Sequence, residues 1–249
     1  MLLARLRNEL GEKQQALEAY NRAIILNPQF ADAYNNRGLL RKHQGDEAGA
    51  LADYDQAIVL NPQLVGAYNN RGILRSDQGD EAGALTDYEQ AIKLDPQFAA
   101  PYINRGILRA EQDDAVAART DFDEGIKLNP QLAIAYYSRG LLRQKQGDLT
   151  GALTDYDQAI ELNPQFAYAY NSRAILRSEQ GDMTGARTDF DQAIKLDPQS
   201  TTYYNRAVLR YSQGDKAGAY ADFLETRDRA TDDVIRQAAE DALQVLEAE

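Results

Sequence analysis

Asparagines recur at a constant spacing along this chain of 249 residues. The series, in which two serines replace asparagine, consists of Asn36, Asn70, Asn104, Ser138, Ser172 and Asn205. A carboxamide both donates and accepts hydrogen bonds, so a row of asparagines suits the backbone of an extended polypeptide whatever its side chains are. Asn69 and Asn171, each one residue before a member of the series, share this chemistry. We predict a row of peptide-binding amides, with the alternative that these asparagines cap local backbone or face water.

Catalytic chemistry has little support in the composition. The chain has one histidine, His43, and no cysteine, so no second imidazole or thiolate is available for a metal site or a nucleophile. His43 follows Lys42 at a position expected to face solvent, where a lone histidine is rarely a base or a ligand. We therefore predict no catalytic residues, no metal and no cofactor, and a protein that is not an enzyme.

Arginines and aspartates recur in matched series. The arginines, each directly after a member of the asparagine series, are Arg37, Arg71, Arg105, Arg139, Arg173 and Arg206, and their aspartates are Asp53, Asp87, Asp121, Asp155, Asp189 and Asp222. The start of the chain has Leu3 and Ala19 at the corresponding two places, so both residues change together. This predicts ion pairs such as Arg37 with Asp53, with a row of arginines that binds an acidic ligand as the alternative. A further arginine series, from Arg7 and Arg41 onward, follows four residues behind the first.

The elements that position these residues follow the prolines. Six of the seven prolines lie 34 residues apart, at Pro28, Pro62, Pro96, Pro130, Pro164 and Pro198. A period of this length is typical of stacked helical units rather than of a single globule. The last unit is one residue short, and the deletion lies in the turn between Pro198 and Tyr203.

Each unit is predicted to contain two α-helices. In the second unit, residues 31–44 have apolar and small residues at helical spacing, and Gly45 then tolerates the left-handed turn conformation. Asp46 is expected to cap a second helix over 47–60, which Pro62 prevents from continuing. No segment alternates polar and apolar residues with a period of two, so the predicted fold class is all-α.

The repeated pattern Tyr-x3-Gly-x11-Ala-x3-Tyr-x2-Ala-x4-Pro resembles the tetratricopeptide repeat. In the second unit its members are Tyr34, Gly38, Ala50, Tyr54, Ala57 and Pro62. The resemblance extends over residues 1 to about 230 and implies a right-handed superhelical solenoid of about seven helix-turn-helix units. The units of this single array are 1–30 (truncated), 31–64, 65–98, 99–132, 133–166, 167–200 and 201–230. Arg37 and Arg41 and their equivalents depart from the Leu and Tyr usual in the family.

The resemblance also implies a concave groove, lined by the first helix of each unit, that holds an extended peptide. The asparagine series resembles the asparagine ladder of some family members. Residues that differ between units are then expected to determine which peptide binds, and these are Ile103, Tyr137, Tyr168, Asp77, Glu111 and Glu179. Their aromatic, aliphatic and acidic character favours a basic or apolar segment of a partner. The alternative for the aromatic residues is packing between adjacent units.

The two ends of the chain are predicted to differ. Residues 231–249 read as a C-terminal capping helix with Thr231 as its N-cap. Its predicted apolar stripe consists of Val234, Ile235, Ala238, Ala242 and Leu246. The first unit lacks its opening turn, which suggests a fragment of a longer protein or a clipped first repeat. Self-association through Leu2, Leu3 and Leu6 at this uncovered end is a further possibility.

Composition excludes several classes of partner. The formal net charge of −12, with acidic and basic residues evenly mixed, disfavours binding to nucleic acid. No apolar run approaches the length of a membrane span, and the first ten residues lack the apolar core of a signal peptide, so we predict no membrane contact and a cytoplasmic protein.

Taken together, these patterns predict a non-enzymatic scaffold for protein–protein interaction that binds an extended, basic or apolar segment of a partner. Two alternatives are a scaffold that assembles with itself and a substrate-recruiting fragment of a larger enzyme.

Overall fold

The computed structural model describes residues 13–248, where every regular element is an α-helix. The chain divides after Pro130 into two compact parts, and each is described by itself. The first part contains α2 (Lys13–Leu26), α3 (Ala31–His43), α4 (Glu47–Leu60), α5 (Val65–Asp77), α6 (Glu81–Leu94), α7 (Ala99–Glu111) and α8 (Ala115–Leu128). The second contains α9 (Ala133–Lys145), α10 (Leu149–Leu162), α11 (Ala167–Glu179), α12 (Met183–Leu196), α13 (Ser200–Ser212), α14 (Lys216–Arg229) and α15 (Asp233–Ala248).

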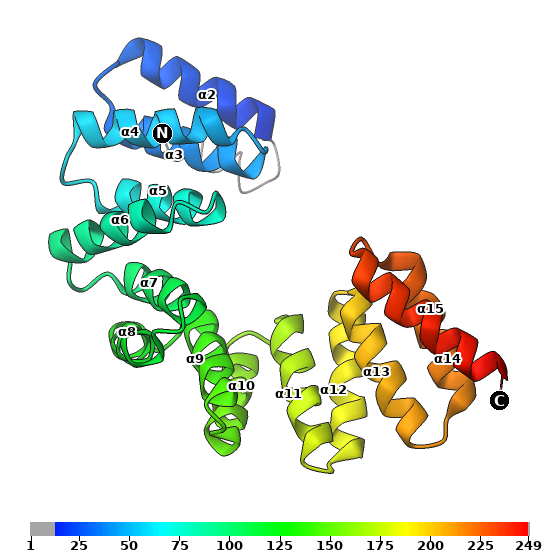
Figure 1. The fold of residues 1–249 in the computed structure, drawn as a ribbon. Coiled ribbons are helices and arrows are strands. Elements are labelled where there is room, and N and C mark those ends of the chain that lie inside the picture. Colours follow the sequence, from blue (N-terminus) through cyan, green and yellow to red (C-terminus); the bar gives the residue numbers. More distant parts are fainter. Residues whose placement is uncertain (1–12, 249) are drawn as a thin grey trace. The chain divides into compact units, whose positions relative to one another are not determined.

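Consecutive helices pack as antiparallel pairs, such as α3 with α4 and α11 with α12 (Figure 1). Successive pairs then stack on one another inside each part, as α4 does on α5 and α12 on α13. The predicted all-α repeat solenoid of helix pairs is therefore confirmed.

The turn inside each pair follows the sequence closely. Gly45 has a φ of +81°, the left-handed conformation that glycine adopts without strain, and Asp46 accepts a hydrogen bond from the Gly49 amide at 2.9 Å. The prediction of this turn and of α4 is confirmed, while α3 ends at His43, one residue earlier than predicted. In the fourth unit Asp113 takes the left-handed place of the glycine, with a φ of 62°.

A glycine three residues after the capping aspartate recurs in most units. A Cβ atom added to Gly49 would lie 2.1 Å from Oδ2 of Asp46, so the glycine leaves the capping carboxylate close over the first turn. The Gly49 carbonyl also accepts a hydrogen bond from Nη1 of Arg41 at 3.2 Å. Ala117 is still capped by Asp114, with its amide 3.1 Å from Oδ1, so the glycine eases this arrangement without being required for it.

In four of the described pairs the two helices meet at a glycine and an aromatic ring, while α11 and α13 have Ala174 and Ala207 at this place. A Cβ atom added to Gly72 would lie 2.7 Å from Cε1 of Tyr88, so only glycine leaves room for the ring in this position. The same ring packs with Ala84 of its own helix and Leu108 of the next pair. The ring therefore fills the space left by the glycine and also joins its helix pair to the next one.

The C-terminal helix α15 covers the last helix pair, although two details of its prediction are wrong. The helix begins at Asp233, and Oδ1 of Asp232 rather than Thr231 accepts the Val234 amide, at 2.7 Å. Val234 is 75% exposed, whereas Ala239 and Leu243 are the buried residues of the helix, packed against Phe223. Ala242 and Leu246 of the predicted stripe do pack against this cluster, whereas Val234 lies outside the buried face of the helix.

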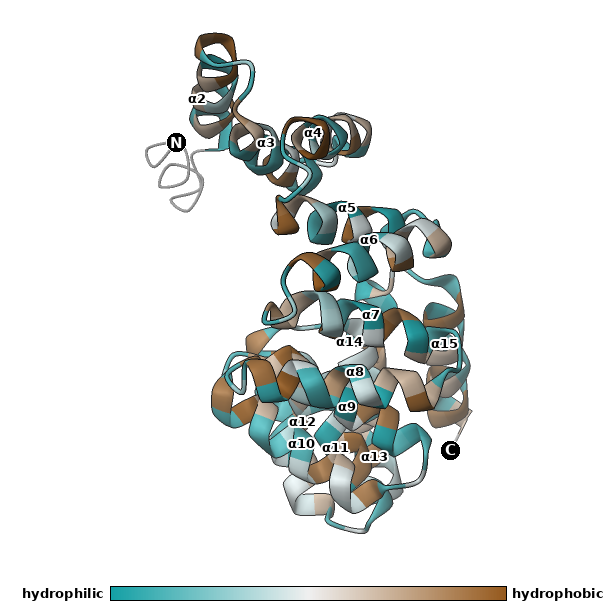
Figure 2. Cartoon of the chain, turned by 90° about the vertical axis from the view of Figure 1, so that its left-hand side faces the viewer, coloured by the Kyte–Doolittle hydropathy of each residue, from teal (hydrophilic) through white to brown (hydrophobic). Residues whose placement is uncertain are grey.

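The predicted truncated start of the first unit and its leucines Leu2, Leu3 and Leu6 lie outside the described residues. The helices carry both hydrophobic and hydrophilic residues (Figure 2). Within residues 13–248, no helix has the length and apolar character needed to cross a membrane.

Candidate functional site

The asparagine series lies on the first helix of each pair, where Asn70, Asn104 and Asn205 each bond to an asparagine on the first helix of the preceding pair. Nδ2 of Asn70 on α5 donates to Oδ1 of Asn35 on α3 at 3.0 Å. The same bond joins Asn104 on α7 to Asn69 on α5 at 2.9 Å, and Asn205 on α13 to Asn171 on α11 at 3.4 Å. We call these three contacts the asparagine pairs.

Each asparagine pair keeps hydrogen-bonding capacity. The bond uses one of the two N–H groups of Asn70, and it leaves the other N–H and the oxygen of that amide outside the pair. Asn36, Asn70, Asn104 and Asn205 are all half-buried. The neighbouring side chain thus holds each donor amide in one orientation, and the remaining groups can bind a polypeptide backbone.

Two predicted site residues lie inside the helix interface instead of on the open face. Asn69 is 6% exposed and accepts the bond from Asn104, and Ile103 is 2% exposed. Ile103 fills the space beside Gly125, where an added Cβ atom would lie 2.2 Å from Cδ1. The prediction that Ile103 contacts a ligand is therefore corrected. The sequence holds a signal for this, since Gly125 replaces the alanine found at the same place in the second and third units.

Aromatic side chains take the place of the asparagine pairs between α9 and α11. The hydroxyl of Tyr137 lies 3.5 Å from Oγ of Ser172, across the same helix interface. The Tyr137 ring lies 4.9 Å from that of Phe166, which meets Tyr168 edge to face at 6.5 Å. Burial raises the pKa of the Tyr137 hydroxyl. Tyr137 thus packs between adjacent units, which was the alternative interpretation, while Tyr168 is 54% exposed.

The predicted acidic residues Asp77, Glu111 and Glu179 are exposed at the ends of their helices. Asp77 forms an ion pair with Lys42, with Oδ2 and Nζ 2.7 Å apart. Burial raises the pKa of the Tyr88 hydroxyl, and the negative charges of Asp77 and Glu111 raise it further. Both carboxylates therefore lie close enough to the Tyr88 hydroxyl to raise its pKa.

The predicted arginine–aspartate pairs are confirmed in all six units. In the third unit, Nε and Nη2 of Arg71 donate to the two carboxylate oxygens of Asp87 at 2.9 and 2.6 Å. A second arginine, Arg75, donates to Oδ2 of the same carboxylate at 2.9 Å, and Asp87 is only 1% exposed. The aspartates that accept from two arginines in this way are Asp53, Asp87, Asp121, Asp155, Asp189 and Asp222. The second arginine of each cluster was missed by the sequence analysis.

Each cluster also contacts an aromatic ring, and clusters inside each part bond to the preceding helix pair. The guanidinium of Arg71 lies 5.7 Å from the ring centroid of Tyr68, and its Nη1 donates to Asp55 of the preceding pair at 2.6 Å. Burial opposes the charge, but the hydrogen bonds to Asp87 and Asp55 hold the pKa of Arg71 above its ordinary value. These arginines join helices, so the alternative of a row that binds an acidic ligand loses its support.

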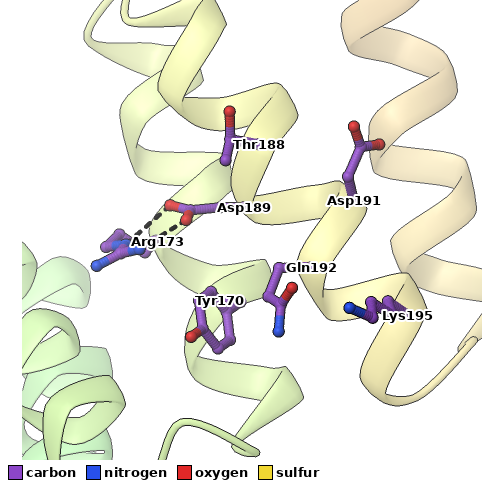
Figure 3. A pocket seen from close by; sticks show the side chains of 7 residues that line it. All are labelled: Tyr170, Arg173, Thr188, Asp189, Asp191, Gln192 and Lys195. Atoms are coloured by element: carbon purple, nitrogen blue, oxygen red, sulfur yellow. Dashed lines mark hydrogen bonds and ion pairs between the residues drawn. The ribbon is translucent and has the colours of Figure 1, made fainter.

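An open recess of about 620 Å³ on α11 and α12 shows one such cluster (Figure 3). Its lining residues are Tyr170, Arg173, Thr188, Asp189, Asp191, Gln192 and Lys195. Arg173 bonds to Asp189 within the recess, and Asp191 bonds to Arg206 of the next unit. The recess therefore lies on the outer side of the arginine–aspartate contacts that join these helices.

Family models match most of the chain. A tetratricopeptide repeat model matches residues 137–201 and 179–234, a TPR repeat model matches 4–45 and 75–113, and a further tetratricopeptide repeat model matches 31–64. A search of curated proteins found no match.

Solved structures share the fold at low sequence identity. A tetratricopeptide repeat protein from Parabacteroides merdae superposes with a TM-score of 0.71 at 21% identity, covering 98% of this chain and 96% of that one. One chain of the APC/C hetero-tetramer Cut9-Hcn1 gives a TM-score of 0.86 at 15% identity, over 98% of this chain and 48% of that one. YrrB, a TPR protein with an unusual peptide-binding site, gives 0.54 at 22% identity, over 75% of this chain and 96% of that one.

Proposed function

This chain belongs to the tetratricopeptide repeat family, whose fold is a scaffold for protein–protein interaction, and we propose that it binds an extended segment of a partner protein along the first helices of its pairs. On this account it acts by binding and not by catalysis. YrrB, whose fold this chain resembles, has a peptide-binding site of its own.

The asparagine pairs carry the proposal. Asn70 and Asn104 are held in place by Asn35 and Asn69, so their free N–H and oxygen groups need little further ordering when a ligand arrives. Carboxamides recognise backbone N–H and C=O groups, which every extended segment offers. Binding through these groups is therefore independent of the partner's side chains.

Side-chain preference comes from the residues around the pairs. Tyr168 is exposed on α11, and Glu111 and Glu179 supply negative charge, while Lys42 offsets the charge of Asp77. Aromatic faces and carboxylates together favour lysine, arginine and apolar side chains. We therefore propose that the partner segment is basic or apolar.

An array of extended peptides tests the proposal. The purified chain is compared with a variant carrying Asn70→Ala and Asn104→Ala, and with a control carrying Gln63→Ala and Gln97→Ala, which removes two exposed amides from the turns between units. We expect basic or apolar peptides to bind the unchanged chain and the control, and to bind the asparagine variant at least about ten-fold more weakly.

A third variant separates binding from structure. Asn35→Ala with Asn69→Ala removes the partners of the same two amides but keeps Asn70 and Asn104 themselves. We expect a smaller loss of affinity here, because the binding amides remain but are less well oriented. If all variants with unchanged helicity bind equally well, the asparagine pairs only join helices and the proposal fails.

A further inference from the structure

An apolar pocket of about 170 Å³ lies in the second part of the chain, between α13, α14 and α15, and its residue Val208 lies about one helical turn after Asn205 of an asparagine pair. Its lining residues are Val208, Tyr211, Phe223, Ala242, Val245 and Leu246. The three helices lie side by side at the C-terminal end of that part (Figure 1). Val208, Tyr211 and Val245 are 48%, 40% and 54% exposed, so the pocket opens to solvent.

Small side chains create this pocket. Inside each part a leucine of the next first helix packs on the aromatic ring, as Leu74 does on Tyr54, and Leu243 of α15 does the same on Phe223. The residue before that leucine is Leu39, Ile73, Ile107, Leu141, Ile175 and Val208 in the first helices, but it is Ala242 in α15. With Val208 on one side of the pocket and Ala242 on the other, two of the smallest side chains of this series flank the ring of Phe223.

The size of the opening indicates what can fill it. An apolar cavity of about 150 Å³ accepts a group the size of benzene, so this pocket fits one leucine, isoleucine or phenylalanine side chain. A second folded copy of the chain would need roughly 800 Å² of surface on each side for a stable dimer. The three exposed apolar side chains offer far less than that, which favours a single anchor residue on a short segment.

The charge of α15 indicates which residues flank the anchor side chain in the partner peptide. Helix α15 carries four acidic residues, Asp233, Glu240, Asp241 and Glu247, against one arginine, Arg236, which is bonded to Asp233. Asp241 is exposed and lies one turn before Val245, on the same side of α15 as that pocket residue. We propose that the pocket binds an aliphatic or aromatic side chain of a partner peptide in which lysine or arginine flanks this anchor.

The proposal can be tested with defined peptides and methyl NMR, which detects weak binding. The probe is an acetylated dodecapeptide of glycine and serine that carries one leucine between two lysines. We expect saturable shifts of the Val208, Val245 and Leu246 methyl signals. A peptide with leucine changed to alanine is expected to bind about ten-fold or more weakly, and one with both lysines changed to glutamate is also expected to bind more weakly.

The same alanine-to-isoleucine change, made inside and outside the pocket, provides a pair of matched variants. Ala242→Ile restores the isoleucine found at the equivalent place in other units, and it is expected to abolish the shifts while helicity and Tm are kept or raised. Ala217→Ile, at an exposed place on α14, makes the same change elsewhere and should bind as the unchanged chain does. If Ala242→Ile lowers helicity, Val245→Asp on the exposed rim replaces it, with the same expected loss.

Three results would overturn the proposal. One is equal binding by the pocket variants and the unchanged chain, and another is the absence of shifts at these methyl groups. The third is a concentration-dependent doubling of mass that Val245→Asp abolishes, because the occupant would then be a second copy of the chain. The variants differ from those of the asparagine pairs, so either binding surface can fail without the other.

Discussion

Six aspartates carry their charge inside the helix pairs, and each bonds to two arginines. A buried carboxylate is tolerated only when its charge and its hydrogen bonds are matched, and Asp87 at 1% exposure meets both conditions through Arg71 and Arg75. The first arginine could be predicted because it changes together with its aspartate. The second could not, because Arg7 is present in the first unit, where Ala19 stands at the place of the aspartate.

A double-mutant cycle at Arg105 and Asp121 tests this arrangement. Asp121→Asn leaves Arg105 and Arg109 without their shared carboxylate, so we expect the free energy of unfolding to fall by about 3–5 kcal/mol. Arg105→Gln should destabilise less, and the double variant should lose less than the sum of both, as measured by urea unfolding. Strictly additive losses would contradict the ion pair. Arg119→Gln, which removes an exposed pair, is the control and should change stability by less than about 1 kcal/mol.

Two tyrosines at equivalent places differ in a single hydrogen bond. The Tyr156 hydroxyl donates to Oε1 of Gln144 at 2.6 Å, whereas the Tyr54 hydroxyl is buried without a hydrogen-bond partner among the described residues. Tyr156→Phe should therefore lower the free energy of unfolding by about 1 kcal/mol, and Tyr54→Phe should leave it unchanged or raise it. Thermal unfolding of both variants checks this. A larger loss for Tyr54→Phe would show that its hydroxyl has a role that the contacts do not reveal.

The helices and turns of each pair are the features that the sequence predicts best. These features depend on local residues. Asp46 caps the start of a helix, Gly45 adopts the left-handed turn, and a proline ends a helix, whatever the rest of the chain does. The exposure of a side chain, in contrast, depends on residues of a neighbouring helix. Ile103 and Tyr137 occupy equivalent places on α7 and α9, yet one is buried beside Gly125 and the other is half-buried against Phe166. A single helix sequence cannot distinguish them, because the neighbouring helix decides.

The contact between α7 and α8 allows a test by exchange. Gly125→Ala should destabilise the chain by about 1–3 kcal/mol, because the new methyl group meets Ile103. Adding Ile103→Asn recreates the combination of Asn69 and Ala91 found in the third unit and should recover most of that loss. Chemical denaturation of the single and double variants gives the comparison. No recovery in the double variant would mean that Gly125 is needed for another reason.

At the scale of the molecule, a period of 34 residues made the family and the all-α fold predictable. The candidate binding residues could be placed only in part. Asn36, Asn70, Asn104 and Asn205 were correctly assigned to the first helices, but the bonds that Asn70, Asn104 and Asn205 make to the first helix of the preceding pair depend on how adjacent pairs stack. The pocket at α15 was also missed, because it follows from the small size of Ala242 in a helix outside the repeat pattern.

Alkaline pH should destabilise the whole chain. Burial raises the pKa of the Tyr54, Tyr88 and Tyr156 hydroxyls above their unfolded value of about 10, so folding favours their neutral forms. Stability from these groups is complete below about pH 10 and is lost as the pH rises further, because the unfolded chain then binds fewer protons. Thermal midpoints between about pH 8 and 11 should therefore fall more steeply than in a variant with phenylalanine at all three places. Equal slopes would contradict this.

The most direct test of the central claim is a titration with a peptide selected from the array and with its backbone N-methylated form. If the asparagine pairs recognise backbone groups, removing one backbone N–H at the contact should weaken binding by about ten-fold. Asn70→Ala with Asn104→Ala should then bind both peptides equally weakly. Unchanged affinity for the N-methylated peptides at every position would contradict the account, because recognition would then rest on side chains alone.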